Sequence, residues 1–169
     1  MFVKASYPRR IPSFRLTSPA IRDIQFQNVY SQHCHHMAAV KANGGSGPAR
    51  EITFLNFTGH ANKHAVKIDA SYAKAPVAEG DGVEIDGVYF MNWAGTVADG
   101  TMDPTIQLHC RPNPLCGSLV VEDFYMGTEA GALETYECRN SYGNGACMNP
   151  YAGRGAYTTT MTVKTFAAA

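Results

Sequence analysis

The chain has 169 residues, of which 45% are hydrophobic and 17% are charged, and its 14 basic and 14 acidic residues balance to a formal net charge of zero. This composition excludes an intrinsically disordered chain, and the length favours one domain with a sizeable core. Because no net charge attracts nucleic acid or an anionic membrane, we expect neither as a partner. No apolar run is long enough to span a bilayer. We also expect the protein to be a monomer.

Residues 1–20 differ in composition from the rest of the chain. They contain basic residues and prolines but no acid. They also lack the continuous apolar segment and the small-residue cleavage site of a secretory signal. Because the repeat described next begins abruptly at Ile21, we expect residues 1–20 to be an atypical basic leader outside the fold. A transit peptide is the alternative.

Two copies of one short pattern, at residues 23–29 and 51–57, organise the chain. Both read acid, apolar, polar, Phe, variable, Asn, apolar. Weaker copies cover residues 87–93 and 118–124, so that Asn or Asp recurs at positions 28, 56, 92 and 123. The alternation of apolar and polar residues within each copy predicts a strand. Repeats with a period of roughly 20–50 residues indicate solenoids, propellers or arrays.

A second short strand is expected after each copy, at residues 37–41, 65–69, 105–110 and 133–138. Corners rich in Gly, Pro and Asn separate the strands, and no segment shows a helical stripe, so the fold is predicted to be all-β. Phe, Ile and Asn in register favour a parallel β-helix of about four rungs over residues 21–156, with Asn side chains hydrogen-bonded along the stack. A β-sandwich, in which Asn28 and Asn56 merely end two strands, is the alternative. Residues 157–169 are expected to be a flexible tail.

Four of the five cysteines fall in two close pairs within loops. This spacing suits two local disulfides, Cys110 to Cys116 and Cys138 to Cys147, and therefore an oxidising compartment. Cys34 is left without a partner. The sequon at Asn56 permits N-glycosylation, although its position within a predicted strand argues against it.

Three histidines surround Cys34, namely His33, His35 and His36. Imidazole and thiolate bind zinc, but four consecutive residues cannot surround one ion tetrahedrally without a sharp turn. We therefore expect a solvated corner, with no metal and no cofactor. The acids at 81, 84, 86 and 99 match no calcium-binding loop and are expected to lie in turns.

An ordered set of motifs resembles the C-terminal half of fungal rhamnogalacturonan hydrolases. The set begins with residues 40–47 (VKANGGSG), 56–60 (NFTGH) and 68–72 (IDASY), and continues with 80–83 (GDGV), 92–96 (NWAGT), the four paired cysteines and Thr128-Glu129. These enzymes stand with the polygalacturonases in glycoside hydrolase family 28, whose fold is a right-handed parallel β-helix. The resemblance covers about residues 21–160 and implies a secreted, pectin-degrading glycosidase.

The resemblance also implies which residues contact the substrate. Polygalacturonases bind it with an Arg-Ile-Lys triplet, which corresponds here to Ala39-Val40-Lys41. Lys41 is expected to bind a uronate carboxylate, while Ala39 in place of arginine is compatible with the rhamnogalacturonan branch. Tyr72 is expected to stack on a sugar ring, and Asp69 to face the same groove. Without the resemblance, Lys41 and Asp69 would be ordinary surface charges and Tyr72 a half-buried corner aromatic.

The family's inverting hydrolysis requires two carboxyl groups, one as acid and one as base. Its aspartates lie in an Asn-Thr-Asp and an Asp-Asp motif upstream of the Lys41 position, and this sequence contains neither. We therefore expect the C-terminal part of such an enzyme, with no catalytic residue present and little hydrolysis. The alternative is a non-catalytic β-helix that binds polysaccharide or only supports assembly.

Overall fold

The computed structural model describes residues 2–5, 20–74, 76–100, 102–150 and 156–164. Eleven strands are present: β1 (Phe2–Ala5), β2 (Ile21–Gln32), β3 (His36–Lys41), β4 (Pro48–Asn62), β5 (His64–Asp69), β6 (Glu84–Val97), β7 (Ile106–His109), β8 (Cys116–Thr128), β9 (Glu134–Arg139), β10 (Ser141–Asn144) and β11 (Thr158–Val163). The described residues include no helix, and therefore none with the length and apolar character to cross a bilayer. The predicted all-β class is confirmed.

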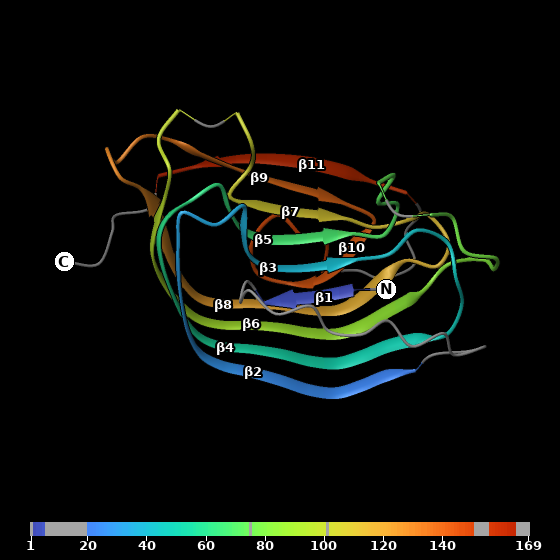
Figure 1. Cartoon of the computed structure of the whole chain (residues 1–169). Helices are drawn as coiled ribbons and strands as arrows, with labels where there is room; N and C mark the ends of the chain where they lie inside the picture. The colour runs from blue at the N-terminus through green and yellow to red at the C-terminus, as the bar shows by residue number, and fades with distance from the viewer. Residues whose placement is uncertain (1, 6–19, 75, 101, 151–155, 165–169) are drawn as a thin grey trace.

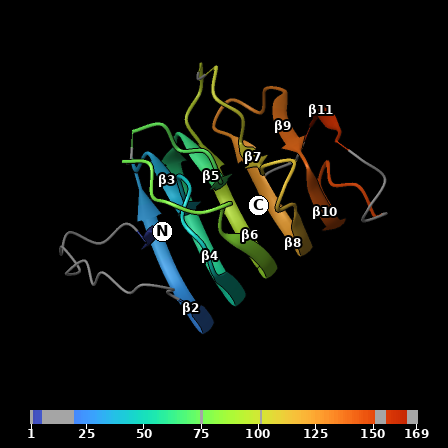
Figure 2. The same cartoon turned by 90° about the vertical axis from the view of Figure 1, so that its right-hand side faces the viewer.

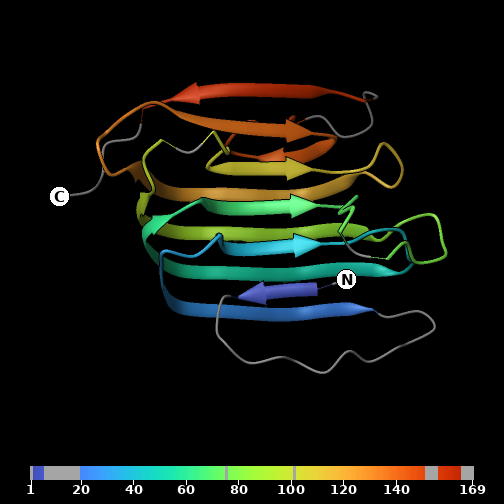
Figure 3. The same cartoon turned by 45° about the horizontal axis from the view of Figure 1, so that its top comes forward.

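The strands form two sheets, and the chain passes from one to the other at each step. One sheet has the order β1-β3-β5-β7-β9-β11 and the other has the order β10-β8-β6-β4-β2. Figures 1 and 3 show long strands of one sheet alternating with short strands of the other along the stack. Neighbouring strands from β2 to β10 pair in parallel, which agrees with a β-helix. The antiparallel hairpins of a sandwich are contradicted for these strands.

The repeat predicted the register of both sheets correctly. Phe26, Phe54 and Phe90 are direct neighbours in the long-strand sheet. In the short-strand sheet Val40 pairs with Ile68, and the same row continues to Leu108 and Cys138. Because a slip of one residue would turn these apolar side chains outward, burial of one face fixes the register.

The Asn residues that recur in the repeat form the predicted ladder of hydrogen bonds. The side-chain amide of Asn56 donates to Oδ1 of Asn28 at 2.9 Å, and that of Asn92 donates to Oδ1 of Asn56 at 2.8 Å. All three residues have positive φ, from 57° to 58°, and Asp123 in the fourth copy has φ 49°. Asn and Asp tolerate this left-handed conformation better than most residues, and a single such residue bends the strand. These residues therefore bend the strands. They do not end them, whereas the sandwich alternative required Asn28 and Asn56 to do so.

Aromatic rings fill the interior in two stacks. The Phe54 ring lies between Phe26 and Phe90, with centroid distances of 5.2 and 5.1 Å. Trp93 stacks on Phe57 at 4.4 Å and donates its indole N–H to the backbone oxygen of Phe54 at 3.0 Å. Burial of each such side chain contributes roughly 1.5–3 kcal/mol, so this core holds the outer faces of the strands rigidly in place.

Both predicted disulfides are present. Cys110–Cys116 joins the end of β7 to the start of β8, and Cys138–Cys147 joins β9 to the segment after β10. Cys34 is a free thiol.

The two ends of the stack differ from the expectation. Residues 2–5 form β1 and pair antiparallel with β3, although residues 1–20 were expected to lie outside the fold. Residues 158–163 form β11 and pair antiparallel with β9, so this part of the expected flexible tail is a regular strand. Figure 2 shows the stack running from β2 at one end to β10 and β11 at the other. Residues 6–19 and 165–169 lie outside the described part of the chain.

Candidate functional site

A groove of about 840 Å³ lies over the outer face of the short-strand sheet. Its walls come from β3, β5, β7 and β9, from the segment before β3 and from the segment after β5. The lining residues are Cys34, His35, His36, Ala39, Lys41, Lys67, Asp69, Ser71, Tyr72, Ala73, Lys74, His109 and Arg139. The three predicted substrate-binding residues, Lys41, Asp69 and Tyr72, are therefore together in one groove.

Strand alternation explains why these side chains face outward. Val40, Ile68 and Leu108 are fully buried, and because side chains alternate along a strand, their neighbours point to the other face. One outward row consists of four residues in direct register on adjacent strands: Lys41, Asp69, His109 and Arg139. The next row consists of Ala39, Lys67, Gln107 and Glu137.

Tyr72 is held over the end of β3 by the corner that precedes β4. Its backbone N–H donates to the oxygen of Ala42 at 2.8 Å, and Ala78 N–H donates to Asn43 at 2.9 Å. Gly44 makes this approach possible, because its φ is +68° and a Cβ there would collide with the backbone oxygen of Ala78. The Asn-Gly-Gly corner of the sequence motif thus positions the groove wall.

The Lys41 ammonium lies over the Tyr72 ring, with Nζ 4.4 Å from the ring centroid. This is a cation–π contact, in which the negative face of the ring attracts the charge. It orients Lys41 at the carboxyl end of β3 and covers one face of Tyr72. A sugar that stacks on that same face has to displace the ammonium.

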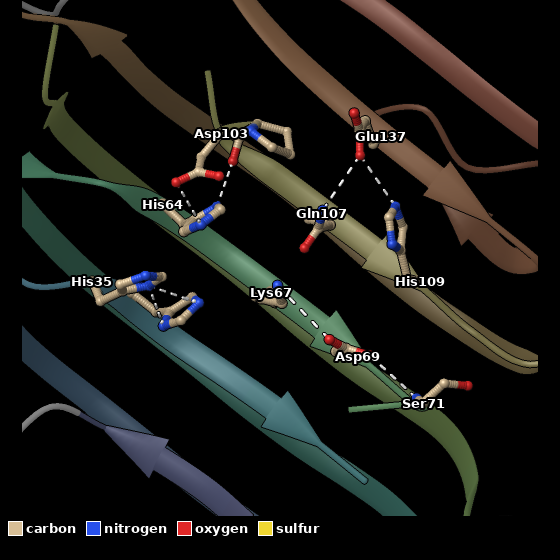
Figure 4. A network of polar contacts seen from close by, with 11 residues as sticks. His35, His64, Lys67, Asp69, Ser71, Asp103, Gln107, His109 and Glu137 are labelled. Atoms are coloured by element: carbon tan, nitrogen blue, oxygen red, sulfur yellow. Dashed lines mark hydrogen bonds and ion pairs between the residues drawn. The ribbon is translucent and has the colours of Figure 1, made fainter. Parts of the chain in front are cut away.

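Figure 4 shows two further polar groups on the sheet face. Lys67 Nζ lies 3.8 Å from Asp69 Oδ2, and the backbone N–H of Ser71 donates to Asp69 Oδ1 at 3.2 Å. Glu137 Oε2 lies 3.2 Å from His109 Nε2, and the Gln107 amide donates to it at 3.4 Å. Each of these two carboxylates therefore already has a polar partner from its own sheet.

Burial, followed by the charge of Arg139, lowers the pKa of His109, and the Glu137 and Asp69 carboxylates oppose this shift. His109 is thereby kept neutral at neutral pH, where it can accept or donate a hydrogen bond. Among the lining residues, Lys41, Lys67, Lys74 and Arg139 are cations and Asp69 is the carboxylate. The groove consequently has an excess of positive charge and suits an anionic ligand.

Sequence reasoning missed His109, Glu137 and Arg139, since each belongs to a later rung. Their signal is the register itself, because they continue the rows of Lys41 and Lys67 across the sheet.

A histidine cluster lies at the opposite end of the same face. Ring nitrogens of His35 and His36 are 3.1 and 3.2 Å apart, and the His64 ring stacks on His36 with centroids 4.8 Å apart. Burial lowers the pKa of all three rings, and that of His36 falls to about 2. His64 was not predicted as a member. It occupies the position of His36 in the next rung, 28 residues later, so the repeat period could have identified it.

The four residues considered and rejected as a zinc site, His33, Cys34, His35 and His36, do not form one cluster in the described part of the chain. The His33 ring packs edge-on against His60 at a centroid distance of 5.6 Å. The backbone N–H of Cys34 donates to Asn62 Oδ1 at 2.9 Å, which fixes the turn between β2 and β3. His33 thus contacts His60 and lies outside the cluster, whereas Cys34 lines the same groove as His35 and His36.

Asn56, the weak glycosylation candidate, has its amide nitrogen in the Asn ladder. A glycan on that nitrogen would replace one of its two N–H groups, so it would have to leave in place the N–H that donates to Asn28.

No family model matches this chain. Individual proteins do. Rhamnogalacturonase A of Emericella nidulans is 40% identical over 146 residues, which are 86% of this chain and 29% of that protein. Rhamnogalacturonase A of Aspergillus niger is 37% identical over 145 residues, which are 86% of this chain and 32% of that protein. By sequence, this chain is related to the fungal rhamnogalacturonases.

The resemblance that the motifs indicated is thereby confirmed. A third relative, probable rhamnogalacturonase B of Aspergillus fumigatus, is 34% identical over 142 residues, which are 84% of this chain and 27% of that protein. The chain thus spans about 30% of the length of the curated relatives it matches.

Proposed function

We propose that this chain is part of a pectin-degrading glycoside hydrolase and that its groove binds the galacturonate-containing backbone of rhamnogalacturonan. The observation that carries the proposal is the row of Lys41, Asp69, His109 and Arg139 beside Tyr72, on the outer face of a parallel sheet. The names of the relatives supply the substrate class. We further infer that residues 21–156 form a right-handed β-helix of about four rungs.

The groove chemistry fits an acidic sugar chain. Lys41 and Lys67 offer compact positive charges on adjacent strands, and Arg139 offers a planar fork that can bind a carboxylate with two hydrogen bonds. Tyr72 offers an aromatic face for a pyranose ring. Asp69 accepts hydrogen bonds and can receive them from sugar hydroxyls. A polyanion whose charges are separated by neutral sugars can engage these groups in turn along the sheet.

The hydrolytic part of the proposal needs two further carboxyl groups. Inverting glycosidases place an acid and a base about 6.5–9.5 Å apart, with water between the base and the sugar. Asp69 and Glu137 are already paired with Lys67 and His109. We propose that the 169-residue chain alone hydrolyses rhamnogalacturonan slowly or not at all, and that Lys41, Asp69 and Tyr72 form a wall of the substrate site.

A non-catalytic polysaccharide-binding β-helix is the second candidate. The contacts of Asp69 with Lys67 and of Glu137 with His109 favour it, because they engage both carboxylates in holding the sheet face together. Under either candidate we propose a secreted, monomeric protein. The two disulfides support an oxidising, extracellular compartment.

Binding and hydrolysis can be measured separately. Isothermal titration calorimetry with rhamnogalacturonan oligosaccharides should give a dissociation constant for the chain that rises about tenfold in Lys41→Gln. Arg22→Gln is the matched control, because it removes one positive charge from β2 on the other sheet and should leave affinity unchanged. Equal affinities of the chain and Lys41→Gln would contradict the assigned site. Release of reducing ends by the chain at a rate abolished by Lys41→Gln would contradict the proposed lack of hydrolysis.

A further inference from the structure

The histidine cluster at the start of β3 and β5 has no role in the proposed sugar site. It is built by three residues from two rungs, His35, His36 and His64. His35 is exposed, His36 is half-buried and His64 is only 2% exposed. Because His35 and His36 line one end of the groove, the cluster is open to solvent on one side.

The separations within the cluster match those of metal ligands. One nitrogen from each ring can be chosen so that all three lie within 4.8 Å of one another. The two closest, on His35 and His36, are 3.1 Å apart. Two imidazole nitrogens bound tetrahedrally to one zinc ion lie about 3.3 Å apart, since each Zn–N bond is about 2.0–2.1 Å. The His35 and His36 nitrogens are therefore already at about the separation that one ion requires.

His64 is already oriented as a ligand. Its Nδ1 lies 2.8 Å from the backbone oxygen of Pro104, and since a carbonyl can only accept, Nδ1 carries the proton. Nε2 then has the lone pair. A backbone carbonyl that fixes the opposite nitrogen in this way is the usual outer contact of a metal-bound histidine.

Asp103 places a carboxylate beside this lone pair. Its Oδ2 lies 3.6 Å from His64 Nε2, which is too long for a hydrogen bond. Figure 4 shows the two side chains next to each other. An unprotonated nitrogen and a carboxylate oxygen at this distance repel each other unless a cation or a proton lies between them. The pair therefore marks one side of a cation-sized position.

We propose that His35, His36 and His64 bind a divalent transition metal ion of the zinc type, with the Asp103 carboxylate beside His64 attracting the ion. Three histidine nitrogens with the fourth position open suit Zn²⁺. The His36 and His64 rings are parallel to within 9°, so one of them has to rotate for both to direct a nitrogen at the ion. His35 is exposed and already contacts both other rings, with centroid distances of 4.3 Å to His36 and 5.3 Å to His64.

Nearby positive charges limit the affinity. Lys63, Lys41 and Lys67 all act on His35, and they also repel a metal ion. We accordingly expect a dissociation constant of about 1–10 μM, far weaker than that of a closed structural zinc site. At that strength the metal would not be required for folding.

The test is titration of the metal-free 169-residue chain with Zn²⁺ alone, followed by calorimetry, and with Co²⁺, followed by the visible absorption of a tetrahedral site. One equivalent is expected to bind. His35→Ala should weaken binding at least about tenfold, and because that side chain is exposed, the fold should survive. Asp103→Asn should also weaken it. The matched control is His33→Ala, which removes an adjacent histidine outside the cluster and should bind as tightly as the unchanged chain.

Two results would overturn the proposal. One is a dissociation constant above about 1 mM for Zn²⁺ in the unchanged chain. The other is loss of binding in His33→Ala while His35→Ala binds as tightly as the unchanged chain, which would place the ion on the other side of the turn. The probe is the metal ion itself, so the outcome does not depend on the proposed sugar site.

Discussion

Lys41 and Tyr72, from two successive rungs, meet at the carboxyl end of the short-strand sheet with Nζ 4.4 Å from the ring centroid. The contact places a cation and an aromatic face side by side, the two features that an acidic sugar requires. It also means that a bound sugar competes with Lys41 for one face of the ring.

Replacement of Tyr72 tests the aromatic wall. Tyr72→Ala removes both the sugar-stacking surface and the partner of Lys41, and we expect affinity for rhamnogalacturonan oligosaccharides to fall about tenfold. Tyr72→Phe retains the ring and loses only the hydroxyl, so its affinity should change less than about threefold. Calorimetry measures both. Equal losses in the two variants would show that the hydroxyl, and not the ring face, contacts the sugar.

Replacement of Asn56 tests the ladder. Asn56→Ala leaves Asn28 and Asn92 each without one hydrogen bond and places alanine at φ 58°, so the free energy of unfolding should fall by about 3 kcal/mol. Asn56→Gly removes the same hydrogen bonds but accepts the positive φ, and should lose about 1–2 kcal/mol. Urea denaturation followed by circular dichroism gives both values. Identical losses would mean that the backbone conformation contributes nothing.

Glu134 at the start of β9 gives the fold a defined pH dependence. Its side chain is buried, and burial raises its pKa from 4.5 to about 7 against the smaller opposing effects of Thr105 and Thr128. The folded state therefore binds this proton more tightly than the unfolded state. The resulting contribution to stability is complete below about pH 4.5 and is lost as the pH rises through about 7.

The difference in unfolding free energy between the unchanged chain and Glu134→Gln isolates this group from the others. As the pH rises from 4.5 to 8, the unfolding free energy of Glu134→Gln should increase by about 3 kcal/mol relative to that of the unchanged chain, because the glutamine cannot ionise. Urea denaturation at several pH values measures it. Glu122→Gln, at an exposed carboxylate on β8, is the matched control for the loss of one acidic side chain. A pH-independent difference for Glu134→Gln would refute the assignment.

The sequence predicted those parts of the fold that repeat from rung to rung. Apolar residues recur at fixed spacing in Phe26, Phe54 and Phe90, and because only one register buries them, the long-strand sheet follows. The disulfides were predictable because their cysteines are close in the chain. Strands β1 and β11 were missed because they pair antiparallel at the edges and share no repeat.

Only those residues of the groove that lie in the quoted motifs were predicted from the sequence. Lys41, Asp69 and Tyr72 lie together as expected. His109 and Arg139 join them through strand pairing between rungs of unequal length, which sequence spacing conceals. The separation of His33 from His35 depends on a turn held by Asn62, 28 residues beyond Cys34, and no local pattern encodes it.

The measurement that tests the central claim most directly compares two ligands on two proteins. Rhamnogalacturonan oligosaccharides with free carboxylates, and the same oligosaccharides after methyl esterification, are titrated into the chain and into Lys41→Gln. If Lys41 binds a uronate carboxylate, its replacement weakens binding of the free acid about tenfold and leaves binding of the ester unchanged. An equal loss with both ligands, or none with either, would contradict the assignment of this groove to an acidic pectin backbone.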